Sequence, residues 1–205
     1  GSGVFINNSL IDTSTGTIDL EGDGSLGLVL DGSHGVEILW SELNANNLVA
    51  IGTGGTASST GAIDQSHGVA VSDSDISAEQ GVQLTGIAGN NTPDGAELGM
   101  VIGVNVETST LTASAGQVKV TGTGGSGSAL EISSGVYLDG SDLRAASLSI
   151  TGDGGATSDL DNASISVGVA ITDSNTLDTN SSNDDLGVIT LSDQVTEQSG
   201  DVVID

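Results

Sequence analysis

Gly135-Val136-Tyr137-Leu138-Asp139-Gly140-Ser141 and, a few residues later, Leu148-Ser149-Ile150-Thr151-Gly152-Asp153-Gly154-Gly155 contain the pattern that decides the fold. In both segments aliphatic residues alternate with polar residues, which is typical of a β-strand with one buried face. Glycine and aspartate follow each alternating stretch, and these residues favour turns. The two segments therefore predict short strands separated by tight turns.

The first segment is one copy of a repeated phrase, Gly-Val-x-(Ile/Leu/Val). Copies open at Gly3, Gly35, Gly68, Gly103, Gly135 and Gly168, separated by 32 to 35 residues. Each copy continues with an isolated aliphatic residue and then with an alternating stretch that ends in glycine. The isolated aliphatic residues are Leu10, Leu43, Ile76, Leu111, Leu143 and Leu177. Because both the spacing and the order of parts recur, residues 1–205 are predicted to form a single repeat domain.

The repeat predicts an all-β fold, a parallel β-helix (solenoid) of about six coils of ~33 residues, with three short strands per coil. Helical repeats of this length need apolar residues at i, i+3 and i+4, and the chain offers Gly, Ser, Thr and Asn instead. A disordered chain has no reason to keep the alternation. The predicted inward ladders are Val4/Val36/Val69/Val104/Val136/Val169, Ile6/Ile38/Val71/Val106/Leu138/Ile171 and Leu20/Ile51/Leu84/Val120/Ile150/Leu191.

Composition excludes several functions. The chain has 2 basic and 28 acidic residues and a net charge of −26, which argues against nucleic-acid binding because phosphate contacts need Lys and Arg. It has no cysteine for disulfides or thiolate metal sites, and no apolar run long enough to predict membrane insertion. It begins Gly1-Ser2-Gly3 without an initiator methionine. We therefore expect an excerpt of a longer chain.

The segments Gly135–Ser141 and Leu148–Gly155 resemble passenger repeats of large secreted bacterial exoproteins, the filamentous-haemagglutinin-like adhesins of two-partner secretion and their autotransporter relatives. The resemblance covers the whole chain and implies a right-handed β-helical stalk, exported to the extracellular space or the bacterial cell surface. It implies a non-catalytic, structural role, with a contribution to adhesion or filament formation. The pattern is specific for architecture and carries little information on activity.

Two histidines share one repeat position, in Ser33-His34-Gly35 and Ser66-His67-Gly68. Stacked coils would bring the rings within about 5 Å of each other, where they are weak candidates for a shared transition metal. A metal site normally needs three or four protein ligands, and no third ligand is evident. We therefore expect an exposed or edge-stacked pair without metal.

Acidic residues also share repeat positions. Glu42 and Asp75 share one repeat position, and so do Glu107 and Asp139 in the neighbouring fourth and fifth coils. Stacked carboxylates repel each other, and Ca²⁺ would relieve the repulsion. Calcium-loop motifs are absent, so the sequence favours a solvated acidic face with no cofactor. A calcium-stabilised module remains the alternative.

Catalytic residues are not predicted. A polysaccharide-active β-helix enzyme needs carboxylates together with Arg or Lys, and the two cations, Lys119 and Arg144, lie apart in the repeat. Trp40, which we expect to point outward, is a candidate contact for a carbohydrate-binding alternative. An ice-binding face would need an unbroken threonine ladder. Thr85, Thr121 and Thr151 share a slot that Glu21 and Gly52 interrupt in the first two coils.

The ends of such a stack expose unpaired strand edges, around Val4–Ile6 and Val202–Ile204. We expect them to pair with flanking coils of the same polypeptide or with identical chains stacked end to end. A host or cell-surface glycan or protein is a further expected partner. The sequence does not identify it.

Overall fold

The computed structural model describes residues 1–25, 32–56, 65–90, 99–126, 130–155, 165–173, 175–179, 188–193 and 202–204. These residues form strands and turns and include no helix, so none of them belongs to a helix that could cross a membrane.

The strands belong to two sheets. The first sheet contains, in spatial order, β1 (Val4–Asn7), β4 (Val36–Leu39), β6 (Val69–Ser72), β8 (Gly99–Glu107), β10 (Leu130–Asp139), β12 (Ile165–Thr172) and β15 (Val202–Ile204). The second contains β2 (Leu10–Asp12), β5 (Glu42–Thr53), β7 (Asp75–Ile87), β9 (Thr110–Thr123), β11 (Asp142–Asp153) and β13 (Thr176–Thr179). In addition, β3 (Thr17–Asp23) pairs with β5, and β14 (Val188–Asp193) pairs with β11.

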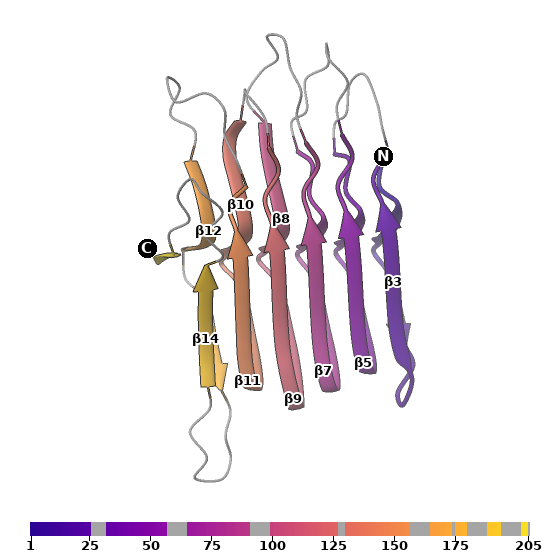
Figure 1. Cartoon of the computed structure of the whole chain (residues 1–205). Helices are drawn as coiled ribbons and strands as arrows, with labels where there is room; N and C mark the ends of the chain where they lie inside the picture. The colour runs from indigo at the N-terminus through magenta and orange to yellow at the C-terminus, as the bar shows by residue number, and fades with distance from the viewer. Residues whose placement is uncertain are drawn as a thin grey trace.

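Each strand pairs in parallel with its equivalent in the next coil. Val36, for example, pairs with Val4 on one side and with Val69 on the other. Figure 1 shows β3, β5, β7, β9, β11 and β14 side by side along the stack, with the two termini at its opposite ends. The predicted all-β solenoid is confirmed. Its described residues make about four uninterrupted turns, formed by β4–β5, β6–β7, β8–β9 and β10–β11, whereas the sequence predicts about six.

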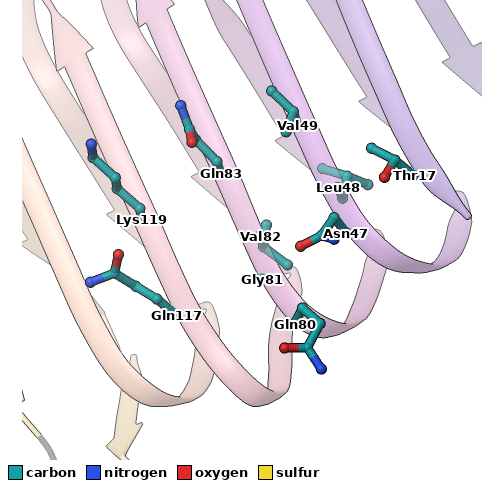
Figure 2. Close-up of a pocket in the computed structure, with 10 residues that line it drawn as sticks. All are labelled: Thr17, Asn47, Leu48, Val49, Gln80, Gly81, Val82, Gln83, Gln117 and Lys119. Atoms are coloured by element: carbon teal, nitrogen blue, oxygen red, sulfur yellow. The ribbon is translucent and has the colours of Figure 1, made fainter.

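The three strands predicted for each coil are separate only in the first and last turns. In the intervening turns the second and third are one strand with a shift of register, as between Ala45 and Asn47 in β5. Figure 2 shows the ribbons curving near Asn47, Gln80 and Gly81. A local irregularity in the hydrogen-bond ladder bends the strand. One continuous strand can therefore form two sides of the coil.

The first two predicted ladders are confirmed by the strand pairing. The valines from Val4 to Val169 pair in sequence, and so do the residues from Ile6 to Ile171. Val36, Val104 and Leu138 are fully buried. Stacked aliphatic side chains therefore fill the narrow core without the aromatic residues on which larger cores depend.

The third ladder contains an error at one position. Ala50, and not Ile51, pairs with Leu20 and Leu84. Ala50 is fully buried, whereas the side chain of Ile51 is 41% exposed. Leu48 and Ala50 share one face of β5, and strand alternation places Ile51 on the other face.

The ladder of isolated aliphatic residues also differs at its start. Ile11 pairs with Leu43, whereas Leu10 pairs with Glu42 and is 68% exposed. Ser9 and Ser41 occupy equivalent corners, since Ser9 N–H donates to Ser41 Oγ. In both coils the residue that packs against the core follows the corner serine by two positions, and in the first coil this residue is the partly buried Ile11.

Glycines join the two sheets along a seam where backbone lies directly against backbone. A Cβ atom on Gly86 would lie 1.9 Å from the carbonyl oxygen of Gly103, and one on Gly103 would lie 2.3 Å from the amide nitrogen of Thr123. We call the residues with this environment the glycine seam. They are Gly22, Gly52, Gly86, Gly122 and Gly152 near the ends of second-sheet strands, and Gly35, Gly68, Gly103 and Gly135 in the repeated phrase. The repeat therefore keeps glycine because a side chain has no space there.

A second column of special residues turns the chain from the first sheet into the second. Its members adopt left-handed backbone conformations, with φ between 46° and 60°. We call them the corner column: Asn8, Trp40, Asp73, Thr108, Gly140 and Asp173. Asparagine, aspartate and glycine tolerate this conformation, whereas a bulky residue such as Trp40 is unusual in it.

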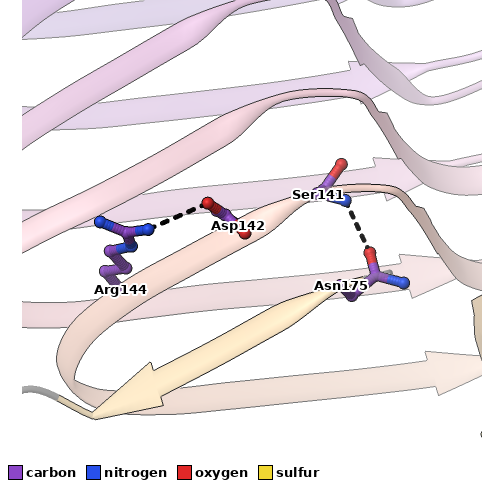
Figure 3. A network of polar contacts seen from close by, with 4 residues as sticks. All are labelled: Ser141, Asp142, Arg144 and Asn175. Atoms are coloured by element: carbon purple, nitrogen blue, oxygen red, sulfur yellow. Dashed lines mark hydrogen bonds and ion pairs between the residues drawn. The ribbon is translucent and has the colours of Figure 1, made fainter. Parts of the chain in front are cut away.

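A ladder of hydrogen-bonded serines follows the corner column. Ser74 Oγ donates to Ser72 O at 2.7 Å and accepts from Ser41 N–H at 3.0 Å, while Ser74 N–H donates to Ser109 Oγ. Ser109 N–H donates to Ser141 Oγ in the same way. At the C-terminal end the amide oxygen of Asn175 accepts from Ser141 N–H at 2.8 Å (Figure 3). The ladder supplies partners for buried backbone groups at each corner, as buried polar groups require.

Replacing Ser74 with alanine is expected to lower the free energy of unfolding by about 1–3 kcal/mol, because Ser41 N–H then loses its acceptor inside the protein. The matched control is Ser9→Ala. Ser9 Oγ is exposed and donates only to Asn7 O, so we expect a loss of at most about 0.5 kcal/mol. Chemical denaturation of both variants measures the difference, and equal losses would contradict a buried role for the ladder.

Candidate functional site

His34 and His67 lie on neighbouring coils, as predicted. Their ring centroids are 4.8 Å apart and the ring planes differ by 11°. The expectation of an exposed or edge-stacked pair is wrong, because the rings stack face to face and are 5% and 1% exposed. This repeat position faces the interior of the solenoid. In the next coil it holds Ile102, which is fully buried.

Burial determines the charge state of this pair. It is the main cause that lowers the pKa of His34 and lowers that of His67 well below its ordinary value. Glu37 opposes the shift at His34, the N-terminus adds to it, and His34 adds to the shift at His67. The backbone N–H of His67 donates to His34 Nδ1 at 3.2 Å, so Nδ1 of His34 carries no proton. Neither ring nitrogen of His67 has a partner among the described residues.

The geometry of the histidines does not suit a shared metal. The nitrogen lone pairs lie in the ring planes, so two nearly parallel rings direct them within two separate planes and not toward one point. No third histidine, cysteine or carboxylate joins them within the described parts of the chain. The pair is a feature of the core with a consequence for pH dependence.

The acidic candidates also meet across neighbouring coils. Glu42 pairs with Asp75 and Glu107 pairs with Asp139, both as predicted. Asn44 Nδ2 donates to Glu42 Oε1 at 2.8 Å. Among the described residues no group of three or more potential metal ligands is assembled, and Ca²⁺ needs six to eight oxygens.

Glu42 and Asp75 belong to a shallow depression of about 410 Å³ at the corner of the second and third coils. We call it the Trp40 depression. It is lined by Asn8, Ser9, Leu10, Trp40, Ser41, Glu42, Asp73 and Asp75. Trp40 points outward, as expected, and is 58% exposed. Its indole Nε1–H donates to Asp73 Oδ2 at 3.2 Å, which fixes the ring beside a neighbouring coil.

A second depression, of about 390 Å³, lies over the bend of the second sheet (Figure 2). Asn47, Gln80, Gln83, Gln117 and Lys119 supply its polar side chains. Lys119 makes no ion pair with the described residues, whereas Arg144 pairs with Asp142 at 3.0 Å (Figure 3). Lys119 is the one charged side chain among the residues that line this depression, and none of these residues is aromatic, so no ring is present against which a sugar could stack.

The slot expected to carry a broken threonine ladder crosses the same face. Thr85, Thr121 and Thr151 pair in register, as predicted. Ile51, and not Gly52, precedes them, with Glu21 before it. The interruption remains, so the face lacks the regular threonine array that ice binding would need.

The Trp40 depression is the feature that sequence reasoning missed. Trp40 and Asp73 are 33 residues apart and share a repeat position, as do Glu42 and Asp75 two residues later. Reading both positions together would have placed the indole and three carboxylates at one corner. Known proteins offer no further guide, because no family model, curated protein or solved structure matches the chain significantly.

Proposed function

We propose that the chain is a non-catalytic structural segment of a secreted bacterial adhesin-like exoprotein, a stalk that holds a binding region away from the cell surface. In this proposal it is a right-handed β-helix of about six coils, and it works in the extracellular space. The observation that carries the proposal is the continuity of two parallel sheets through every turn, which builds length. The resemblance of the repeats to adhesin passengers supports the same role.

The two edge strands of the first sheet are consistent with a solenoid to which further coils add. β1 and β15 are its terminal strands, and each has a partner on one side only among the described residues. An unpaired parallel edge is a template for another strand. The proposed partners are flanking coils of the same polypeptide or identical chains stacked end to end. The net charge of −26 would oppose lateral association of such rods.

A calcium-stabilised module is the competing function, favoured by the stacked carboxylate pairs Glu42–Asp75 and Glu107–Asp139. Thermal unfolding separates the two. We expect the melting temperature to change equally, and little, with millimolar Ca²⁺ or Mg²⁺, because a passive stalk has no selective site. A cation that binds only the native state at 100 times its dissociation constant would add about 2.7 kcal/mol. A large upward shift with Ca²⁺ alone would replace the stalk by the calcium-stabilised module.

A further inference from the structure

Trp40 is a residue that the fold does not require. The other members of the corner column are asparagine, aspartate, threonine or glycine, all smaller, and all except the β-branched Thr108 are better suited to a left-handed backbone. The indole is 58% exposed, so it adds little to the core. Leu10, which lines the same depression, is 68% exposed. Two large apolar side chains thus lie in one depression whose other lining residues are all polar.

The indole is held in a fixed position. Its hydrogen bond to Asp73 joins the second coil to the third, and the corner backbone of Asp73 is itself bonded to the next coil through Glu107 O. A side chain that is already ordered loses less entropy when a partner binds. Anchored tryptophans are for this reason frequent among the residues that dominate binding energy.

Carboxylates surround this apolar surface without a basic residue to balance them. Glu42, Asp73 and Asp75 all line the depression, and the described residues place no Lys or Arg in contact with any of them. The depression therefore combines an aromatic face, an aliphatic side chain and three negative charges. Such a combination fits an organic cation, since the face of an indole attracts guanidinium and ammonium groups.

We propose that the Trp40 depression docks a basic segment of a partner protein, with an arginine guanidinium stacked on Trp40 and hydrogen-bonded to Glu42 and Asp75. Arginine fits best because its planar group stacks on an aromatic ring and donates two parallel hydrogen bonds to a carboxylate. The net charge of −26 attracts a basic segment at long range and repels a polyanion. A hard divalent cation would gain nothing from Trp40 or Leu10. This inference does not depend on the stalk proposal.

The chain has one tryptophan, so its fluorescence reports on the depression directly. The probe is a nine-residue peptide with three Arg-Gly-Leu units, compared with the same peptide carrying uncharged citrulline in place of arginine. We expect a saturable change in fluorescence with the arginine peptide only. Calorimetry should show that Glu42→Gln/Asp75→Asn weakens binding about tenfold. Trp40→Asn, which installs the residue found at Asn8, should weaken it by at least as much.

The matched control is Asp19→Asn/Glu21→Gln, which removes the same charge from exposed positions on the outer face of β3. Its affinity should stay within about twofold of wild type, because distant surface charges are screened by salt. An equal loss in this control would reduce the effect to non-specific attraction and overturn the proposal. Equal binding of the citrulline peptide would also overturn it. Saturable binding of a neutral chito-oligosaccharide, without a response to the arginine peptide, would assign the depression to sugar instead.

Discussion

Replacing Gly86 with alanine is expected to destabilise the solenoid by at least about 4 kcal/mol, or to prevent folding. The added methyl group would lie 1.9 Å from the carbonyl oxygen of Gly103 and 2.6 Å from its carbonyl carbon. Both glycines belong to strands that are hydrogen-bonded on either side, Gly86 to the coils that contain Gly52 and Gly122. Neither backbone can move away alone, so relief requires separation of the two sheets.

Gly140 provides the control. It lies in the corner column with φ of 55°, and no atom lies within 4 Å of the position of a Cβ atom. Gly140→Asn places there the residue that Asn8 already supplies in the first coil, so we expect a change within about 0.5 kcal/mol. Chemical denaturation followed by far-ultraviolet circular dichroism measures both variants. A Gly86→Ala protein as stable as Gly140→Asn would show that the seam can open and that its glycines are dispensable.

The repeat alone predicted the solenoid and its first two core ladders, because like residues recur at a fixed spacing and parallel stacking aligns them. From the sequence, the glycines that follow the alternating stretches, such as Gly152, are predicted to be turn residues. Their real environment is a contact between Gly86 and Gly103, which belong to different sheets. A period shows which residues are equivalent between coils. It does not show which positions within a coil face each other.

The error of register at Ile51 has a physical origin in the glycine seam. The four residues Leu48-Val49-Ala50-Ile51 are all apolar, so the stretch can bury either set of alternate residues, and residue size favours Val49 and Ile51. The structure buries Leu48 and Ala50, because their phase places Gly52 against Gly68 in the glycine seam. Small residues with a strict steric role therefore determine the register more strongly than the large apolar residues do.

The sequence predicted which candidate residues lie next to each other. It did not predict how deeply they are buried or what surrounds them. Equivalent repeat positions placed His34 beside His67 and Glu42 beside Asp75. The burial of the histidines could have been inferred from Ile102 and Val167, the aliphatic residues at the same position. For Trp40 the sequence predicts exposure. The depression around it depends on the corner geometry, which has no signature as simple as a period.

The buried histidines are expected to make the solenoid less stable as the pH falls below 6.5. Both pKa values are lowered in the folded protein from the ordinary value of 6.5, mainly by burial. Between the folded pKa and 6.5 the unfolded chain binds protons that the folded chain does not, so the free energy of unfolding rises with pH. The slope is at most about 1.4 kcal/mol per pH unit for each histidine, or about 2.7 for the pair.

His67→Ile separates this contribution from that of the carboxylates. Isoleucine is the residue at the equivalent position Ile102, and the backbone N–H of residue 67 keeps its acceptor, His34 Nδ1. The pKa of His67 is lowered further than that of His34, so we expect the slope below pH 6.5 to fall by half or more. Stability at neutral pH should be unchanged or higher, because a buried ring without partners for its nitrogens is removed. Urea denaturation at several pH values tests this expectation. A slope that is the same in both proteins would mean that His67 does not contribute to it, because the ring is already protonated or accessible to water in the native solenoid.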